Sequence, residues 1–496
     1  MNTATIVLHP RIQVGRVDPR IFGGFLEHLG RAIYDGVYQP GAASANDNGL
    51  RSDLADALRR LAISVVRYPG GNFVSGYDWE QGVGPIEKRP VVRDLAWESL
   101  EPNTFGTDEF LRLCAELDWD PMITVNLGTG TPEQACNWVE YCNGRAGSRY
   151  ADLRVRNGHS EPYGVKLWCL GNEMDAPWQL GHTPAEPYAV KAEQAGRMMK
   201  RFDPSIELVV CGSCLPSMET YMDWDRTVLE YVGDVADYIG FHRYVGEEGL
   251  DVTDYLAVTA SIDRQIEEMD AVCRFVQAKK RASSRAYLCF DEWNIWYRNH
   301  TIQGQWSTAP RLLEERYNLE DALVAAGFLL SFIRHADVLK VANLAQLVNV
   351  LAPILTEEDR LLRQTIYWPF AMISSHGEGK ALRTAYDGST YRSEKYGEVP
   401  TIDHAAILNG DRLSVFLVNK DPVNASLVRI KAPSHRVVGV EDGMMISGTD
   451  PKQENTFEEP DAVGPTEFAA WRLDDGLAEM ELPPLSFVRA VLRLEM

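Results

Sequence analysis

The feature that most constrains the fold is an alternation of strand-like and helix-like segments over residues 21–375. Short apolar runs that suit buried strands are followed by longer stretches with apolar residues at three- and four-residue spacing, which is typical of amphipathic helices. We count eight such pairs. Alternation at this spacing predicts parallel strands joined by crossover helices. Eight repeats predict an α/β fold of the (β/α)8 type, a TIM barrel.

The pattern changes near residue 377. Short β-like runs follow at 413–418, 425–430 and 486–492, with turn sequences such as Asn409-Gly410 between them. This predicts a C-terminal antiparallel β-sandwich, similar to a jelly roll. A further strand-like segment at 5–14 precedes the eight pairs, so we expect it to join the C-terminal strands.

The predicted division of the chain follows from these patterns. Residues 16–378 form the barrel, and residues 1–15 and 379–496 together form the β-sandwich domain.

Two of the predicted strands end in an acid. Residues 165–178, VKLWCLGNEMDAPW, begin apolar and then reach Asn172 and Glu173, and residues 286–294, AYLCFDEWN, reach Glu292 in the same way. An acid at the end of a buried strand is a candidate catalytic group because apolar surroundings raise its pKa. A helix N-cap with an acidic first turn explains one such stretch equally well. Two such carboxylates are the minimum equipment for cleaving a glycosidic bond.

Other polar side chains also follow predicted strands. The carboxyl ends of barrel strands meet on one face, so these side chains are expected to gather there. With the two acids they are Glu27, His28, Arg67, Asn72, Asn126, Asn172, Glu173, His242, Tyr244, Glu292 and Gln346. A capped helix or a turn explains any one of them, but explains the whole set poorly. Trp97, Trp178 and Trp296 lie in loops beside the acids, and sugar faces stack on aromatic rings.

Charge and composition exclude several classes of partner. The formal net charge of −22 argues against nucleic acid or an anionic membrane as a partner, because both require basic patches. We find no apolar run of about 18 residues that would span a membrane. The N-terminus has neither the basic segment nor the apolar segment of a signal peptide. The eight cysteines are dispersed and suit reduced core positions, so we expect a cytoplasmic protein.

Metal and cofactor motifs are weak. Cys211 and Cys214 form a CxxC without a second pair at zinc-site spacing, and no HExxH occurs. We therefore expect no metal and no cofactor.

Four motifs carry a resemblance to a known family. GGFLEHLG at 23–30, RYPGGN at 67–72, LGNEMD at 170–175 and DEWN at 291–294 occur in the same order as the motifs of glycoside hydrolase family 51, and the chain resembles these α-L-arabinofuranosidases over essentially its whole length. The resemblance implies a barrel with a C-terminal β-sandwich. It also implies a homo-oligomer, a hexamer in many members.

The resemblance further implies roles for individual residues. Glu173 would be the acid/base and Glu292 the nucleophile of a retaining, double-displacement exo-glycosidase. Such an enzyme would remove terminal α-L-arabinofuranosyl groups from arabinan or arabinoxylan oligosaccharides. The substrate-binding residues would be Glu27, Arg67, Asn72, Trp97, Asn172, His242, Tyr244, Trp296 and Gln346.

Two other functions remain open from the sequence. A β-xylosidase or an endoglucanase could use the same barrel, because a fold does not determine a substrate. A non-catalytic carbohydrate-binding protein could keep the tryptophans, but it would not need both Glu173 and Glu292.

Overall fold

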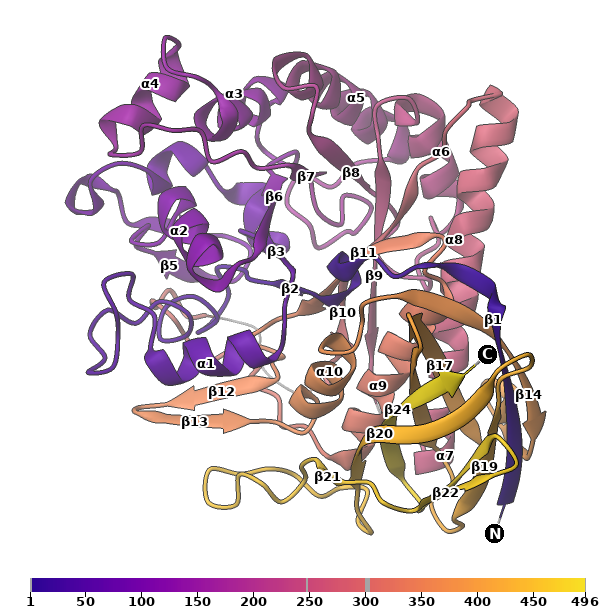
Figure 1. Ribbon diagram of the computed structural model, residues 1–496. Coiled ribbons are helices and arrows are strands. Elements are labelled where there is room, and N and C mark those ends of the chain that lie inside the picture. The colour runs from indigo at the N-terminus through magenta and orange to yellow at the C-terminus, as the bar shows by residue number, and fades with distance from the viewer. Residues whose placement is uncertain (1, 247–248, 299–303, 496) are drawn as a thin grey trace.

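The computed structural model describes residues 2–246, 249–298 and 304–495 (Figure 1). Eight parallel strands close into a barrel in the order β10-β11-β2-β3-β6-β7-β8-β9, so the predicted (β/α)8 fold is confirmed. The barrel strands are β2 (Gly23–Phe25), β3 (Val65–Tyr68), β6 (Asp120–Val125), β7 (Leu167–Leu170), β8 (Glu207–Cys211), β9 (Tyr238–Val245), β10 (Tyr287–Ile295) and β11 (Leu339–Ala345).

Helices follow each barrel strand. They are α1 (Ser52–Arg60), α2 (Thr107–Leu117), α3 (Pro132–Asn143), α4 (Arg149–Arg156), α5 (Ala185–Phe202), α6 (Asp223–Val232), α7 (Val252–Leu256), α8 (Thr259–Lys280), α9 (Leu319–Arg334) and α10 (Tyr367–Ser374). The start of α3 illustrates the local cause. The Thr131 hydroxyl accepts from the Gln134 backbone N–H at 3.2 Å, and Pro132 occupies the first turn, where it loses no helical hydrogen bond.

Apolar spacing in the sequence predicts one helix over 254–279 and another over 363–373, and both predictions are wrong in detail. The single helix expected over 254–279 is two helices, α7 and α8. The Asp254 carboxylate accepts hydrogen bonds from Ser393 and from the Glu394 backbone, which ties α7 to the second domain. The helix expected from residue 363 begins at Tyr367, because Arg363 pairs with Ile354 in a hairpin of β12 (Ile354–Glu357) and β13 (Arg360–Arg363).

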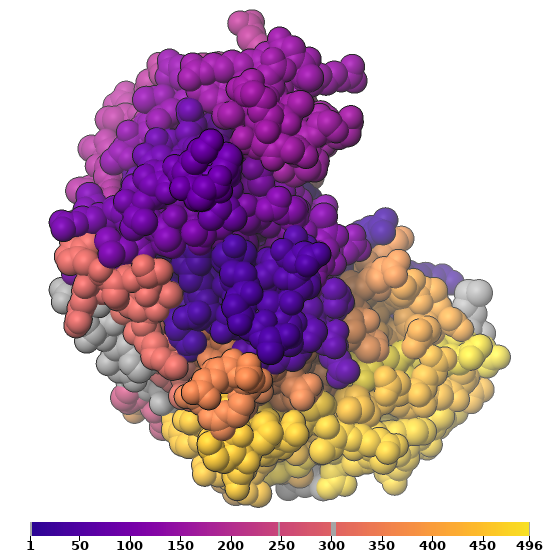
Figure 2. All heavy atoms as spheres, turned by 90° about the vertical axis from the view of Figure 1, so that its left-hand side faces the viewer, coloured from indigo at the N-terminus to yellow at the C-terminus, as the bar shows by residue number. Residues whose placement is uncertain are grey.

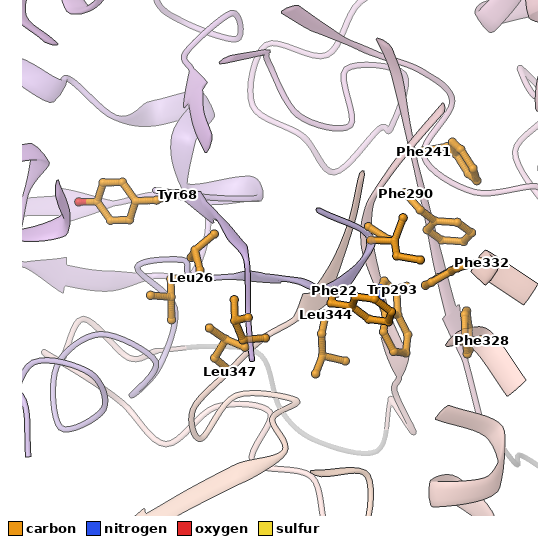
Figure 3. Packing of buried hydrophobic residues seen from close by; sticks show 14 of the residues in the cluster. Phe22, Leu26, Tyr68, Phe241, Phe290, Trp293, Phe328, Phe332, Leu344 and Leu347 are labelled. Carbon is orange, nitrogen blue, oxygen red and sulfur yellow. The ribbon is translucent and has the colours of Figure 1, made fainter. Parts of the chain in front are cut away.

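The barrel is filled and covered by buried side chains. One cluster gathers Val65, Met122, Leu167, Cys169, Val209, Tyr238, Cys289 and Val341, which come from seven of the eight strands. Figure 3 shows a second layer, in which aromatic rings of β9 and β10 lie beside those of α9. Phe290 and Phe332 have ring centroids 5.3 Å apart, and Trp293 stacks on Phe328 at 5.0 Å. This packing fixes β10, the strand that carries Glu292.

The cysteines take no part in disulfides. All eight are free, and six of them are buried. The expectation of reduced, mostly buried thiols is therefore confirmed.

The second domain is one curled sheet of ten strands, in the order β21-β20-β24-β18-β17-β14-β1-β19-β23-β22. Its first strand is N-terminal: β1 (Asn2–Arg16) pairs antiparallel with β14 (Lys380–Gly388) and parallel with β19 (Ser426–Lys431), as expected for the segment at 5–14. In Figure 1 indigo β1 accordingly runs among orange and yellow strands. The remaining strands are β17 (Ile402–Asn409), β18 (Arg412–Asn419), β20 (Arg436–Ser447), β21 (Thr466–Glu467), β22 (Trp471–Asp474), β23 (Leu477–Leu482) and β24 (Ser486–Glu495).

Helix α9 joins the two domains. Its residues 319–333 are all buried, and it packs against β14, β17, β18 and β24 as well as against α8 and α10. At its C-terminal end Arg334 binds Asp263 of α8 and Asp403 of β17, each at 2.7 Å. Figure 2 shows the purple barrel segments above the yellow C-terminal sheet.

Short elements complete the fold. Two small hairpins are β4 (Val92–Asp94) with β5 (Ser99–Glu101), and β15 (Thr390–Ser393) with β16 (Gly397–Pro400). The 3-10 turns are η1 (Pro19–Phe22), η2 (Asn72–Gly76), η3 (Trp79–Gly82) and η4 (Ile86–Lys88). In the part of the chain that the structure describes, we find no helix with the length and apolar character to cross a membrane.

Candidate active site

The two acids singled out by the sequence meet at the mouth of the barrel. Glu292 lies within β10, whereas Glu173 follows β7 after Gly171, whose φ of +90° turns the chain out of the strand. Both side chains are buried, and His242 of β9 lies between them. Its Nδ1 is 2.9 Å from Glu173 Oε1 and 3.5 Å from Glu292 Oε2. The nearest oxygens of the two carboxyls therefore lie within 4.8 Å of each other.

Glu292 is held by two donors. Arg67 Nη1 donates to Oε1 at 2.7 Å, and the Tyr244 hydroxyl donates to Oε2 at 2.8 Å. Arg67 is fully buried and also contacts Asp291 at 3.4 Å, so its charge is matched by carboxylates on β10. A carboxylate oriented on both oxygens by such donors can face a reacting atom without rotating away.

Glu173 receives hydrogen bonds from two rings. The Trp178 indole Nε1 donates to Oε2 at 2.6 Å, and His242 Nδ1 lies at hydrogen-bond distance from Oε1. Burial opposes ionisation of Glu173, but the hydrogen bond and charge of His242, together with Trp178, hold the pKa of this carboxyl below its ordinary value. From the sequence we expect apolar surroundings to raise the pKa of an acid at this strand end, and the structure differs at this point.

The pKa of the His242 imidazole shifts in the opposite direction. Burial opposes protonation of the imidazole, but Glu292, Asp291 and Glu173 raise its pKa well above the ordinary value. Since His242 Nδ1 and Glu173 Oε1 are 2.9 Å apart, one proton is shared by this pair rather than held by one residue.

A chain of amides extends from Arg67. Arg67 Nη2 donates to Asn172 Oδ1 at 2.6 Å, which directs the Asn172 amide nitrogen toward Asn72 Oδ1 at 3.4 Å. Arg67 and Asn172 are both buried. The ends of β3 and β7 are thereby tied together at the cavity.

Glu27 is the third carboxyl of the site. Its Oε1 accepts from the Phe73 backbone N–H and from the Trp97 indole, both at 2.9 Å, and its own backbone N–H donates to Gln346 Oε1 at 2.9 Å. Burial and the charge of Glu292 raise the pKa of Glu27 to about 8, so this acid is protonated at neutral pH.

Gly71 makes room for Glu27. The residue has a φ of +32°, and a Cβ placed there would lie 2.2 Å from Glu27 Oε2. A glycine is therefore required at position 71, because the backbone has a positive φ there and because Glu27 lies too close for a side chain.

These residues surround a cavity of about 320 Å³. It is lined by Phe25, Glu27, Leu29, Gly71, Asn72, Ala96, Trp97, Glu173, Trp178, Leu215, Tyr244, Glu292, Trp296, Arg298, Leu313, Gln346 and Leu351. Eight residues expected from the sequence line it directly: Glu27, Asn72, Trp97, Glu173, Tyr244, Glu292, Trp296 and Gln346. The other three, Arg67, Asn172 and His242, lie behind this surface and bind its polar groups.

Some residues of the site were not singled out as binding residues. Trp178 follows Pro177 closely after Glu173 and was noted only as a loop aromatic, and Asp291 precedes Glu292 in a strand that reads as apolar. Leu215 and Arg298 come from loops whose sequence carries no signal of a site. His28, at a strand end, is not in the cavity, and it bridges Glu101 at 2.7 Å and the Tyr68 hydroxyl at 2.8 Å.

One group in the described part of the chain has the geometry to hold a metal ion, namely Glu173, His242 and Glu292. Two of these groups, His242 Nδ1 and Glu173 Oε1, are 2.9 Å apart and share a hydrogen bond. The arrangement thus suits proton transfer between two carboxyls and a substrate.

Comparisons with known proteins agree with this geometry. Residues 57–248 match the domain family described as "Alpha-L-arabinofuranosidase 1 domain", and residues 291–486 match "Alpha-L-arabinofuranosidase C-terminal domain".

Among similar proteins, an intracellular exo-α-(1→5)-L-arabinofuranosidase of Acetivibrio thermocellus is 44% identical over 85% of this chain and 86% of its own. One of the same description from Streptomyces lividans is 42% identical over 98% of this chain and 75% of its own. The solved structure of a family 51 α-L-arabinofuranosidase from Bifidobacterium longum, 35% identical, superposes with a TM-score of 0.95 over 99% of this chain and 100% of that one.

Proposed function

Because the chain belongs to the α-L-arabinofuranosidases of glycoside hydrolase family 51, we propose that it removes terminal, non-reducing α-L-arabinofuranosyl groups from oligosaccharides with retention of configuration. The observation that carries the proposal is the spacing of the two acids. Oxygens of Glu173 and Glu292 lie within 4.8 Å of each other. Retaining glycosidases place their carboxyls about 5–5.5 Å apart, whereas inverting enzymes leave about 6.5–9.5 Å for a water molecule.

Glu292 is the nucleophile in this proposal. Its carboxylate attacks the anomeric carbon and forms a covalent glycosyl–enzyme ester while the glycosidic oxygen leaves. Arg67 and Tyr244 hold the attacking group in place. Tyr244 lines the cavity beside Glu292, so its hydroxyl can stay bonded to Glu292 as the carboxylate becomes a neutral ester.

Glu173 is the acid and then the base. The proton shared with His242 moves through Glu173 to the leaving oxygen, and the carboxylate then takes a proton from the water that hydrolyses the ester. The Trp178 hydrogen bond keeps Glu173 facing the cavity.

The cavity favours a single terminal sugar. At about 320 Å³ it is at the lower end of the ~300–1,000 Å³ typical of small-molecule pockets. Glu27, Asn72 and Gln346 present polar groups to sugar hydroxyls, and Trp97 and Trp296 present rings to its faces. Arabinan and arabinoxylan fragments are the proposed substrates, and the α-(1→5) descriptions of the relatives favour arabinan.

The wider organisation is also proposed. Residues 16–378 form the catalytic barrel, and residues 1–15 and 379–496 form the second domain; β1 ends at Arg16 and β14 begins at Lys380. We place the protein in the cytoplasm, in line with the intracellular relatives. We also expect a homo-hexamer from the family resemblance, which sedimentation analysis can test.

The experiment separates the two carboxyls. With aryl arabinofuranosides that release acidic phenols, Glu173→Ala should still form the glycosyl–enzyme intermediate, which should accumulate. Added azide should restore turnover and give a glycosyl azide of retained configuration. Glu292→Gly should be nearly inactive on all substrates, and azide should give the inverted product. The configuration of each product is determined by NMR. An inverted product from Glu173→Ala and a retained product from Glu292→Gly would contradict the assignment. Faster hydrolysis of aryl xylosides than of aryl arabinofuranosides would contradict the substrate class.

A further inference from the structure

A second cavity adjoins the proposed catalytic pocket. It has a volume of about 230 Å³ and is lined by Arg243, Tyr244, Trp296, Arg298, Lys395 and Tyr396 among others. We call it the annex. Tyr244, Trp296 and Arg298 also line the catalytic pocket, so they form the wall between the two cavities. Lys395 and Tyr396 come from the turn between β15 and β16, so the annex lies where the barrel meets the second domain.

Three cations face the annex in a chain with a net charge of −22. Elsewhere many arginines and lysines bind carboxylates, as Arg334 does. Among the residues that the structure describes, Arg243, Arg298 and Lys395 make no ion pair. Arg298 and Lys395 instead stand over the rings of Trp296 and Tyr396, at 4.9 and 5.5 Å. Such contacts leave the positive charge available to an anion.

Arg243 is the most deeply placed of the three. Its Nη2 donates to Ser261 Oγ at 2.8 Å, and its Nε is buried without an acceptor among the described residues. The indole Nε1 of Trp296, in the shared wall, is also buried without an acceptor there. Burial lowers the pKa of Arg243, and the charge of Glu268 only partly offsets this. Buried donors without partners are rare, and a missing ligand is one cause of them.

We propose that the annex binds the carboxylate of an acidic sugar, such as a uronic acid unit. Lys395 and Arg298 would pair with the carboxylate at the annex surface, and Arg243 would add positive charge from below. The volume is smaller than the ~300–1,000 Å³ of pockets for drug-sized ligands, which suits one sugar ring. Aromatic side chains on both sides suit a sugar ring better than a bare inorganic anion.

The acidic sugar has two sources. It is either a unit of the oligosaccharide whose arabinofuranosyl group occupies the catalytic pocket, or a free sugar acid. The first source rests on the proposed function, whereas binding of the carboxylate does not.

Calorimetric titration tests the binding itself. Sodium D-glucuronate should bind the full-length protein, and D-glucose, which lacks the carboxylate, should not. Lys395→Gln should weaken glucuronate binding about twofold to fivefold, as expected for one exposed charge contact. Added NaCl should weaken it further, because salt screens exposed charges. Lys431→Gln, the same change on exposed Lys431 of β19, is the matched control and should bind like the wild type. Equal binding of glucuronate and glucose, or equal affinities of the two variants, overturns the proposal.

Kinetics identify the source. Two arabinofuranosyl-substituted xylo-oligosaccharides are compared, one with and one without a neighbouring glucuronosyl branch. If the branch is the ligand, the acidic-to-neutral ratio of kcat/KM falls in Lys395→Gln and not in Lys431→Gln. If glucuronate binds but this ratio does not change, the ligand is the free sugar acid. If neutral substrates are hydrolysed but glucuronate does not bind, only the proposal for the annex is contradicted. If glucuronate binds but no arabinofuranoside is hydrolysed, only the proposed function is contradicted.

Discussion

At the scale of single residues, three acids share one cavity but have different neighbours. Glu292 faces a buried arginine and a tyrosine hydroxyl. The pKa of Glu173 is lowered by the histidine beside it, whereas the pKa of Glu27 is raised by burial and by a carboxylate neighbour. Environments that separate the protonation of acids in this way are typical of catalytic sites.

Glu27 leads to a prediction on pH dependence. With a pKa near 8 it is neutral at pH 7, and it becomes a second anion beside Glu292 as the pH rises through 8. Once ionised, Glu27 can no longer donate to a sugar hydroxyl, and its charge repels that of Glu292, so kcat/KM should fall above pH 8. In Glu27→Gln, which cannot ionise, the normalised profile should extend to higher pH. Profiles of kcat/KM from pH 5 to 10, measured for the wild type and Glu27→Gln, test this prediction. The same decline above pH 8 in both proteins would contradict it.

His242 leads to a prediction on leaving groups. If it supplies the proton that Glu173 donates, His242→Ala should reduce kcat/KM for oligosaccharides by about 10²–10⁴, the usual contribution of general acid catalysis. Aryl arabinofuranosides with acidic phenols need little protonation and should lose much less. A plot of log kcat/KM against the pKa of the leaving phenol should steepen. An equal loss for every leaving group would show that His242 acts on Glu292 instead.

At the scale of elements, the site depends on loops tied to one another across neighbouring strands. Asp175 follows Glu173 after β7, and its carboxylate accepts from Ser213 Oγ at 2.8 Å, Thr220 Oγ1 at 2.9 Å and the Cys214 backbone at 3.2 Å. These donors belong to the loop after β8, which also carries Leu215 into the cavity.

This loop contact predicts a defect in substrate binding. Asp175→Asn turns an acceptor of three hydrogen bonds into a group with its own donors, at a cost of about 1–3 kcal/mol. The loop and Leu215 should shift, and KM for arabino-oligosaccharides should rise about tenfold, equivalent to about 1.4 kcal/mol. Thr220→Val removes only one donor and should have a smaller effect. Steady-state kinetics of both variants provide the measurement, and a wild-type KM in Asp175→Asn would contradict the role of the loop.

At the scale of the whole molecule, the two domains are joined by an ionic group as well as by the apolar face of α9. Arg334 lies between Asp263 and Asp403, and its Nη1 also donates to the His404 carbonyl at 2.8 Å. Burial alone would raise the pKa of both aspartates, but the charge of Arg334 holds each below its usual range.

Removing Arg334 should therefore destabilise the protein in a pH-dependent way. Arg334→Gln leaves two carboxylates facing each other and should cost about 3 kcal/mol at pH 7. Aspartates with a depressed folded-state pKa stabilise the protein above their unfolded-state value of about 3.9, and this contribution is lost as the pH falls through the lower folded value. The difference in melting temperature between the wild type and Arg334→Gln should thus be large at pH 7 and smaller near pH 3.

Calorimetry at both pH values tests this prediction. The control is Arg197→Gln, which removes an exposed arginine paired with Glu193 and Asp234 and should change stability by less than about 1 kcal/mol. A difference for Arg334→Gln that is the same at pH 7 and pH 3 would contradict the ionic account.

The sequence by itself determined the barrel, the β-rich second domain and the strand ends that carry the site. Apolar periodicity reports which face of an element is buried, and a barrel brings all carboxyl ends of its strands to one mouth. Glu173, Glu292 and Glu27 could therefore be predicted to lie together from their positions alone. Local signals also sufficed for the start of α3, because a Thr cap followed by Pro acts within one turn.

Only the tertiary structure decided the rest. The helix predicted over 254–279 is divided into α7 and α8, and Asp254 of α7 accepts a hydrogen bond from the distant residue Ser393. The raised pKa of His242 depends on carboxyls from β10 and from the loop after β7. The annex depends on Lys395 and Arg243, from different domains, lining one cavity. Charges and cavities arise from residues far apart in the chain, because electrostatic energy depends on distance in space and on burial. Local sequence patterns contain neither quantity.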